Sequence, residues 1–271
     1  MSRIKLFSLT FKACQNIDII LHQAALGSVP RSIENPLKTN NININGFINI
    51  LWAAKQENIS RIVYAASSSS YGDSKKLPKI ENEIGSPLSP YAVTKYVNEL
   101  YAGVFSNLYG LELIGLRYFN VFGRKQDPDG AYAAAIPKFI KAFINHQEPV
   151  IHGDGSQSRD FTYIDNVIQA NELAATTKNP DALNQVYNIA CGDQSFLNEL
   201  VENLRDLLSD FDSEIKNIKI KNGPERIGDV KHSLASIEKA QKLLNYQPTH
   251  NLKQGLNSAI EWYWNYFKTN S

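Results

Sequence analysis

Tyr91 and Lys95 are the two residues of this sequence whose types and spacing point most directly to chemistry. They form the pattern Y-x-x-x-K near the start of an expected helix, and residues four apart lie on one helix face. An ammonium beside a phenol favours the phenolate, so we expect the pKa of Tyr91 to fall below its usual value of about 10. Such a phenol can act as a base toward a hydroxyl proton at neutral pH. The pattern alone is weak, because a Tyr and a Lys at this spacing also occur on many helix surfaces.

Four consecutive serines follow the expected strand that precedes this helix. The strand covers Arg61 to Ala66, and the serines that follow it are Ser67, Ser68, Ser69 and Ser70. Active sites of open α/β sheets lie at the carboxyl ends of strands, where small hydroxyls can bind a ligand. We therefore expect the serine hydroxyls to share a site with Tyr91. A serine-rich loop without a function is the alternative.

The elements that position these residues alternate along the first half of the chain. Short apolar runs rich in Ile, Val and Leu predict buried parallel strands at 18–21, 61–66 and 111–116, and a further strand at 186–190 is expected to return to the same sheet. Helical spacing is present at about 33–57 and 90–108, and the second helix opens with Ser89 as its cap and Pro90 in its first turn. This alternation predicts a doubly wound α/β fold.

Beyond Asn120 the alternation loosens into connections rich in Gly, Pro and Asp. We therefore expect two domains, a sheet domain over 1–120 and a smaller α/β substrate domain over 121–271. Helices are expected near 135–145, 195–208, 235–244 and 252–267. The asparagine-rich stretch 40–49 is expected to form a solvated helix face.

A glycine-rich turn is missing from the sequence. Dinucleotide-binding sheets begin with a strand, a turn with several glycines, and a helix whose N-terminus holds the pyrophosphate. The closest pair here, Gly153 and Gly155, lies late in the chain and predicts an ordinary turn. We therefore expect an incomplete doubly wound, Rossmann-like parallel sheet that lacks its first βαβ units.

Composition excludes several classes of protein. A chain of 271 residues with 43% hydrophobic residues is long enough for a large core, and a net charge of +1 argues against a nucleic-acid surface. The two cysteines, Cys14 and Cys191, form no C-x-x-C motif and join no His cluster, so we expect neither a disulfide framework nor a metal site. No run approaches the roughly 18 apolar residues of a membrane span. We expect no membrane partner and a cytoplasmic location.

Five segments in order carry a resemblance to a known family. They are HQAALGSVPRS (22–32), YAASSSSYGD (64–73), SPYAVTKYVNE (89–99), LRYFNVFGRKQDP (116–128) and GDGSQSRDFTYIDNV (153–167). These segments resemble the motifs of extended short-chain dehydrogenases/reductases, the NAD-dependent epimerase/dehydratase family, and within it most closely the 4-epimerases of UDP-N-acetylglucosamine. The resemblance implies NAD as the cofactor, a UDP-hexose as the substrate, and inversion at C4 through a 4-keto sugar.

The resemblance also implies a role for individual residues. Ser67 and Tyr91 would share the sugar 4-hydroxyl, with Tyr91 as the base and Lys95 polarising it and binding the nicotinamide ribose. Substrate contacts are expected from Gly27, Ser28, Ser68, Asn120, Lys138, Arg159, Arg226, Asp229 and Ser233, and cofactor contacts from Ala24, Tyr91, Lys95 and Phe119. A local ion pair between Arg159 and Asp160 is the alternative for Arg159. His22 is interpreted as a structural residue.

The expected substrate sugar depends on Ser233. Similar enzymes that accept N-acetylhexosamines have a small residue at the matching position, and those restricted to glucose and galactose have a bulky aromatic one. A small side chain leaves room for the acetamido group, so the resemblance implies UDP-GlcNAc and UDP-GalNAc as substrates.

Other functions and a partner follow from the same resemblance. Related enzymes include sugar-nucleotide dehydratases and decarboxylases, but dehydratases usually carry Asp-Glu where this chain has Ser68-Ser69. After an epimerase and a dehydratase or decarboxylase, the third hypothesis is a non-catalytic remnant that binds UDP-sugars or pairs with a homologue. It arises because, without the glycine-rich turn, we expect the chain alone to bind NAD poorly. Family members similarly form homodimers through a four-helix bundle, which implies the helices at 33–57 and 90–108.

Overall fold

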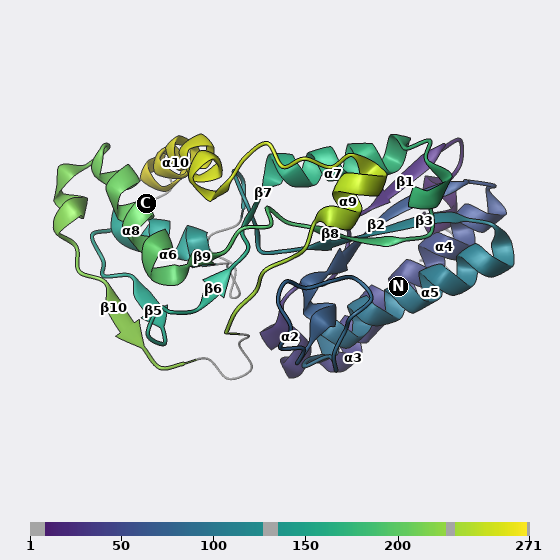
Figure 1. Cartoon of the computed structure of the whole chain (residues 1–271), viewed down its shortest axis with the longest axis horizontal. Helices are drawn as coiled ribbons and strands as arrows, with labels where there is room; N and C mark the ends of the chain where they lie inside the picture. Colours follow the sequence, from purple (N-terminus) through teal and green to yellow (C-terminus); the bar gives the residue numbers. More distant parts are fainter. Residues whose placement is uncertain (1–8, 127–134, 226–230, 270–271) are drawn as a thin grey trace.

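A computed structural model describes residues 9–126, 135–225 and 231–269 of the chain. The molecule is elongated and has two halves, a parallel sheet covered by helices and a smaller half of helices and short strand pairs (Figure 1). Among the described residues, no helix combines the length and the apolar character that crossing a membrane requires.

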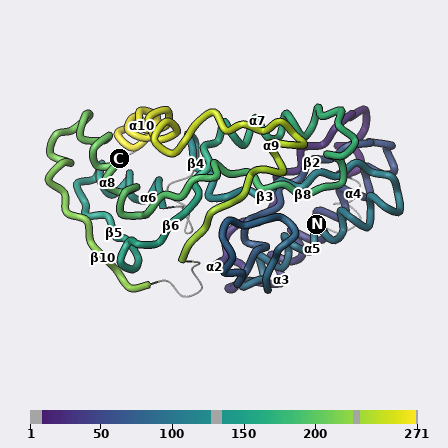
Figure 2. The backbone as a smooth tube through the Cα atoms, viewed as in Figure 1, coloured from purple at the N-terminus to yellow at the C-terminus, as the bar shows by residue number. Residues whose placement is uncertain are grey.

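A four-stranded parallel sheet forms the centre of the larger half. Its strands are β1 (Ile19–His22), β2 (Arg61–Ser67), β3 (Glu112–Tyr118) and β8 (Val186–Ile189), in the order β1-β2-β3-β8. Strands β2 and β3 are buried along most of their length, which explains their nearly continuous apolar sequences. The predicted α/β fold with a parallel sheet is confirmed, and the strand expected at 186–190 is β8, which lies beside β3 (Figure 2).

Helices cover both faces of this sheet. Helices α4 (Gly46–Gln56) and α5 (Pro90–Tyr109) lie on one face, and α7 (Ile164–Thr176) and α9 (Glu238–Leu244) lie on the other (Figure 1). Helix α7 was not expected from the sequence. Its cap position is Tyr163, whose side chain makes no capping hydrogen bond, so the usual sequence signal for a helix start is missing.

The helix expected over 33–57 is wrong as a single element. Four shorter pieces replace it, namely α2 (Val29–Glu34), α3 (Pro36–Asn40), the π-helical turn η1 (Asn41–Asn45) and α4. Pro36 has no backbone N–H and cannot continue α2, and the Asn35 side chain caps the next piece by accepting a 2.9 Å hydrogen bond from Lys38 N.

The asparagine-rich stretch also differs from the expected solvated face. Asn40, Asn41 and Asn45 are exposed, but Asn43 is only 2% exposed. A π-helical turn takes more residues than an α-helical turn and shifts the face on which later side chains lie. The shift leaves Asn43 in the interior.

The smaller half contains the remaining elements. Its strand pairs are β4 (Val121–Phe122) with β7 (Thr162–Tyr163), β5 (Val150–His152) with β10 (Lys221–Gly223), and β6 (Ser158–Arg159) with β9 (Ser195–Phe196). Its helices are α6 (Ala135–Ile144), α8 (Leu197–Ser209) and α10 (Leu252–Thr269), which pack their apolar faces together around Phe143, Leu204 and Tyr263. Short 3-10 turns are η2 (Ser68–Tyr71), η3 (Pro180–Ala182) and η4 (Ser213–Asn217).

The two halves are not separate lengths of chain. After β4 opens the smaller half, the chain returns to the sheet with α7 and β8, goes back for α8, and returns again with α9 before α10 (Figure 2). Residues 121–271 therefore contribute elements to both halves.

Gly153 and Gly155 lie in the turn between β5 and β6, as predicted. Their φ values are 90° and 78°, a backbone conformation that suits glycine.

Candidate active site

Ser67, Tyr91 and Lys95 come together at the carboxyl end of β2. Ser67 is the last residue of that strand, and its side chain is hydrogen bonded to the Tyr91 phenol. Helix α5 presents Tyr91 and Lys95 from its first turns, which Ser89 caps by accepting a 3.1 Å hydrogen bond from Ala92 N. The arrangement places a phenol, a hydroxyl and an ammonium at one strand end.

Ser69 sets the direction of the Ser67 hydroxyl. Both the backbone N–H and the hydroxyl of Ser69 donate to Ser67 Oγ, over 3.2 and 2.9 Å. A serine oxygen has two lone pairs, so these two donors leave its own proton to be donated elsewhere. The hydrogen bond with Ser67 lowers the pKa of Tyr91. Sequence reasoning gave Ser69 no role of its own.

Burial decides the protonation of the tyrosine and the lysine. It raises the pKa of Tyr91 above its ordinary value, and the hydrogen bond from Ser67 opposes that rise. The lowering expected from Lys95 is therefore wrong for this structure. Lys95 Nζ lies 6.0 Å from the Tyr91 ring centroid and donates to Ala65 O instead, over 2.7 Å. Burial also lowers the pKa of Lys95 to about 8, which Glu99 opposes.

A buried ion pair lies one helical turn beyond Lys95. Glu99 accepts two hydrogen bonds from Arg117, over 2.9 and 2.6 Å, and the two side chains are only 6% and 3% exposed. The guanidinium also donates to Glu81 O over 2.8 Å and lies 4.8 Å from the Tyr71 ring centroid. This pair joins α5 to β3, and the sequence gave no signal for it beyond the residue types.

The segment after β1 carries three of the expected contact residues. Ala24 and Gly27 are exposed, and Ser28 caps α2 by accepting a 3.3 Å hydrogen bond from Arg31 N. His22 ends β1 with its ring 5.6 Å from that of Phe47, and burial lowers the pKa of His22 to about 4. A neutral, packed imidazole agrees with the structural interpretation of His22.

A cavity of about 450 Å³ in the smaller half is lined by Asn120, Lys138 and Arg159. Its walls also include apolar side chains of α6 and β4, among them Phe122 and Phe139. The sheet register connects this cavity to the serine, because Ser67 pairs with Tyr118 and Asn120 follows two residues later. Three residues expected to hold the nucleotide therefore line one cavity.

Ser233 lies beside the strand that carries Arg159. Its backbone N donates to Ser158 O over 3.1 Å, and Arg159 donates to Ser158 O and to Lys231 O over 2.9 and 3.1 Å. Ser233 is half-buried, as is Ser68 at the start of η2. These contacts bring Ser233 to the Arg159 side of the site.

Phe119 differs from the other expected contacts. It is fully buried in the apolar core of the sheet, with its ring 6.0 Å from that of Tyr71. The structure places its side chain in the core and not on an open surface. Arg226 and Asp229 lie outside the residues that the structure describes.

Asp160 is a buried carboxylate that sequence reasoning considered only as a partner of Arg159. It accepts hydrogen bonds from Cys191 N, Gly192 N and Ala235 N, over 2.9, 3.1 and 3.2 Å. Burial raises the pKa of Asp160 to about 7 despite these donors. The carboxylate thus fastens the loop after β8 and the segment that follows Ser233 to β6.

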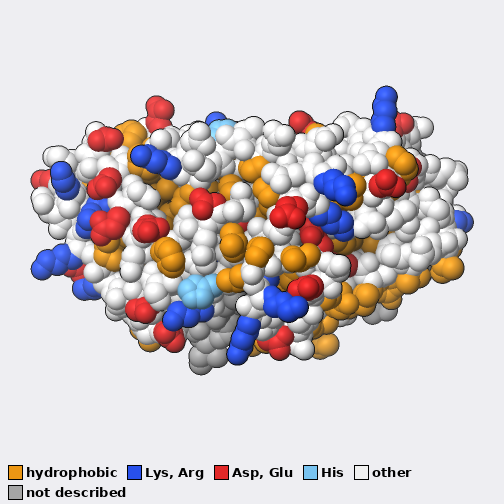
Figure 3. Space-filling view, viewed as in Figure 1, with side chains coloured by type: hydrophobic (Ala, Val, Ile, Leu, Met, Phe, Trp, Pro, Cys, Tyr) orange, Lys and Arg blue, Asp and Glu red, His pale blue; other side chains and the backbone are white. Residues whose placement is uncertain are grey.

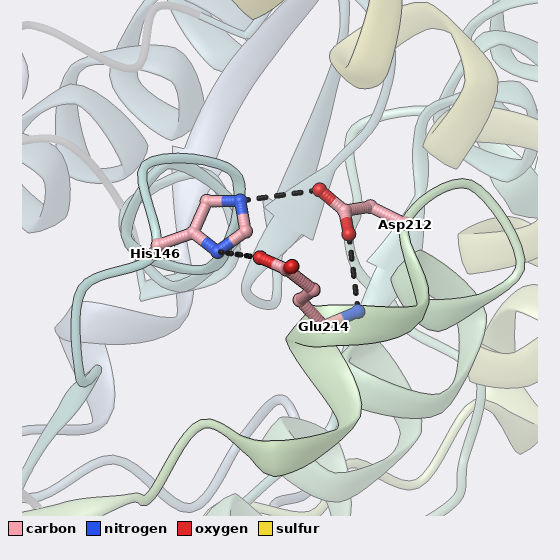
Figure 4. Close-up of side chains that lie close together, drawn as sticks. All are labelled: His146, Asp212 and Glu214. Atoms are coloured by element: carbon pink, nitrogen blue, oxygen red, sulfur yellow. Dashed lines mark hydrogen bonds and ion pairs between the residues drawn. The ribbon is translucent and has the colours of Figure 1, made fainter.

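One group with metal-ligand side chains occurs among the described residues, at His146, Asp212 and Glu214 (Figure 4). The imidazole Nε2 lies 3.1 Å from Asp212 and Nδ1 lies 3.8 Å from Glu214, so the two ring nitrogens face different carboxylates. One ion would bind only one of these nitrogens. His146 and Glu214 are exposed and Asp212 is half-buried, which is more typical of a surface ion pair than of a metal centre.

The sequence matches a known protein family. The model of the NAD dependent epimerase/dehydratase family matches residues 7–190. A putative UDP-glucose 4-epimerase of Methanocaldococcus jannaschii is 37% identical over 249 residues, which cover 92% of this chain and 77% of the relative.

Two solved structures share the fold. The UDP-N-acetylglucosamine 4-epimerase of Methanobrevibacter ruminantium M1, in complex with UDP-N-acetylmuramic acid, has a TM-score of 0.88 at 39% identity and covers 95% of this chain and 80% of its own. The UDP-glucose 4-epimerase of Thermotoga maritima with UDP-glucose has a TM-score of 0.89 at 30% identity, covering 100% and 84%. The chain therefore belongs to the NAD-dependent epimerase/dehydratase family.

Proposed function

We propose that this protein catalyses the NAD-dependent 4-epimerisation of a UDP-hexose, with UDP-GlcNAc and UDP-GalNAc as its substrate pair. The observation that carries the proposal is the hydrogen bond between Ser67 and Tyr91, with Lys95 on the same helix. Similarity to 4-epimerases over more than nine-tenths of the chain supports the same reaction.

Tyr91 and Ser67 perform the proton chemistry in this proposal. As a phenolate, Tyr91 takes the proton of the sugar 4-hydroxyl and returns it after the 4-keto sugar has turned its other face, so the pKa that burial raises in the free chain has to fall when NAD and substrate bind. Ser67 donates to the oxygens that carry charge and holds the sugar in place. NAD, when bound, accepts the hydride from C4 and gives it back to the opposite face, so no metal or separate nucleophile is required.

Lys95 fits a role at the nicotinamide ribose. An ammonium has three N–H donors, and within the described part of the chain Lys95 Nζ donates one hydrogen bond, to Ala65 O. Two donors are therefore available for ribose hydroxyls. Ala24, exposed at the carboxyl end of β1, would lie on the same side of the sheet.

The cavity beside β4 fits the UDP moiety. Its volume of about 450 Å³ lies within the usual range for small-molecule sites, and its wall is mainly apolar with a few polar groups. Lys138 and Arg159 bring positive charge suited to a diphosphate, and Asn120 brings an amide. Gly27, Ser28 and Ser68 would contact the diphosphate or the sugar from the sheet side.

The preference for an N-acetylated sugar rests on Ser233. The relatives named above act on different sugars by name, one on UDP-glucose and one on UDP-N-acetylglucosamine, so family membership leaves the sugar open. A small side chain at this position leaves space for an acetamido group. The alternative of a dehydratase has less support, because Ser68 and Ser69 cannot replace an Asp-Glu acid and base pair.

We also propose a homodimer in which two copies pair through α4 and α5. Helix α5 exposes Val93, Leu100, Tyr101, Val104 and Leu108, at spacings that place them along one stripe. Figure 3 shows hydrophobic side chains gathered along the lower right edge, where α5 lies. A second copy of the stripe would cover this surface.

The free cysteines, Cys14 and Cys191, are compatible with the proposed cytoplasmic location.

The proposal is tested with the full chain and purified UDP-GlcNAc. NAD is added in excess. We expect UDP-GalNAc to form, detected by chromatography, with no net consumption of NAD. Calorimetry with UDP-GlcNAc runs alongside. Binding without any epimer would favour the non-catalytic alternative, and loss of water from the sugar would favour a dehydratase.

A further inference from the structure

Asn43 makes three hydrogen bonds from a buried position. Its Oδ1 accepts from Leu26 N over 2.7 Å, and its Nδ2 donates to Leu26 O over 3.2 Å and to Thr94 Oγ1 over 3.0 Å. The amide therefore pairs with both backbone polar groups of Leu26, much as a neighbouring strand would. Leu26 directly precedes Gly27 and Ser28, the residues proposed to contact the substrate.

The third bond connects this segment to the catalytic helix. Thr94 is 2% exposed and lies between Tyr91 and Lys95 on α5, and its hydroxyl donates to Tyr91 O over 2.8 Å. The donor and acceptor capacities of this hydroxyl are thus shared between Asn43 and the backbone of Tyr91. One buried side chain joins the segment after β1 to the first turn of α5.

The backbone around Asn43 indicates that this placement is specific. Asn43 is the central residue of the π-helical turn η1, a rare conformation that is frequent at functional sites. The flanking Asn41 and Asn45 are exposed, and Asn45 Nδ2 donates only to Asn41 Oδ1 in the described residues. Residues of the same type therefore differ sharply in environment within five positions.

We propose that Asn43 is a positioning residue that sets the segment Leu26–Ser28 against α5 and so fixes the distance between the substrate-contacting segment and Tyr91. It touches neither substrate nor cofactor and acts through Leu26 and Thr94. The proposal rests on the proposed epimerase function for its kinetic readout, and on the structure alone for its hydrogen-exchange readout.

The test compares Asn43→Ala with Asn45→Ala, an exposed asparagine of the same turn. We expect amide hydrogen exchange at Leu26 to become about tenfold faster in Asn43→Ala, because a lost hydrogen bond is worth about a factor of ten, and to stay unchanged in Asn45→Ala. We expect KM for UDP-GlcNAc to rise about tenfold in Asn43→Ala while kcat stays within about threefold. A fall in kcat at unchanged KM, or unchanged exchange at Leu26, would overturn the proposal.

A second pair of variants tests the same link without replacing Asn43, in case Asn43→Ala does not fold. Thr94→Val removes the hydroxyl that joins Asn43 to α5, and Thr94→Ser keeps it. We expect Thr94→Val to raise KM for UDP-GlcNAc severalfold and Thr94→Ser to restore the wild-type value; equal KM values in the two would contradict the link.

The two proposals can fail separately. If the wild-type chain forms no epimer, exchange at Leu26 and the Kd of UDP, measured by calorimetry, still test Asn43. We expect Asn43→Ala to raise that Kd about tenfold and Asn45→Ala to leave it unchanged. An equal Kd in both variants would exclude the positioning role whatever the reaction is.

Discussion

Lys95 Nζ donates a 2.7 Å hydrogen bond to the carbonyl oxygen of Ala65, two residues before Ser67 on β2. This bond joins the catalytic helix to the strand end and holds the ammonium in a place where its side chain is almost fully buried. The position is costly for a charge, because burial disfavours the ionised form. We therefore expect Lys95 to be required for activity and to lower the stability of the fold.

Replacing Lys95 with Met should stabilise the chain and abolish epimerisation. Burial lowers the pKa of Lys95 from 10.5 to about 8, so between these values the unfolded state binds more protons than the folded state. The free energy of unfolding of the wild type therefore rises with pH across that window. We expect Lys95→Met to be more stable by about 1 to 3 kcal/mol at pH 7, with the difference shrinking toward pH 10. Urea denaturation at both pH values measures this, and a difference independent of pH would contradict it.

Replacing Tyr91 with Phe should remove proton transfer and keep binding. We expect kcat for UDP-GlcNAc to fall by about 10² to 10⁴, the usual contribution of a general acid or base, and Kd by calorimetry to stay within about threefold. Tyr96→Phe, on the same helix, is the matched control and should retain activity. Similar kcat values in the two variants would assign the proton transfer to another group.

Replacing Ser233 with Tyr should change which sugar is accepted. A phenol at this position would fill the space proposed for the acetamido group, so we expect turnover of UDP-GlcNAc to fall at least about tenfold more than turnover of UDP-glucose. The ratio of the two kcat/KM values is the measurement. Equal losses on both substrates would place the acetamido group elsewhere.

Replacing Glu99 with Gln should strongly destabilise the fold. The change leaves the Arg117 guanidinium buried without its carboxylate, and breaking a buried pair costs about 3 to 5 kcal/mol. Glu112→Gln is the control, because the Arg61–Glu112 pair also holds β3, here to β2, but its side chains are 14% and 33% exposed. In Glu112→Gln we expect the free energy of unfolding to fall by about 1 kcal/mol or less. Similar midpoints of urea denaturation in the two variants would contradict the argument from burial.

Replacing Leu100 with Glu should separate the proposed dimer. A charge in the middle of the apolar stripe of α5 opposes pairing with a second copy, so we expect a shift from dimer to monomer in analytical ultracentrifugation. Ile168→Glu is the control, because Ile168 is an equally exposed apolar residue of α7 on the opposite face of the sheet. A wild-type monomer, or a dimer that survives Leu100→Glu, would remove this interface.

The elements that depend on local pattern could be predicted from the sequence. The strands β2 and β3 and the helix α5 lie within two residues of their expected bounds, because continuous apolar runs and the Ser89-Pro90 start are signals carried by neighbouring residues. Helix α7 and the pieces around Pro36 were not predicted. The first has no capping side chain, and the second depends on packing that overrides a helical pattern.

The sequence by itself determined the parallel α/β fold, the shared helix face of Tyr91 and Lys95, and the serine at a strand end, because each depends on residue type and spacing. Only the tertiary structure decided that burial raises the pKa of Tyr91, that Glu99 and Arg117 form a buried pair, and that Asn43 lies inside while Asn45 faces solvent. Burial and pairing are set by segments far apart in the chain, and no local pattern records which of them meet.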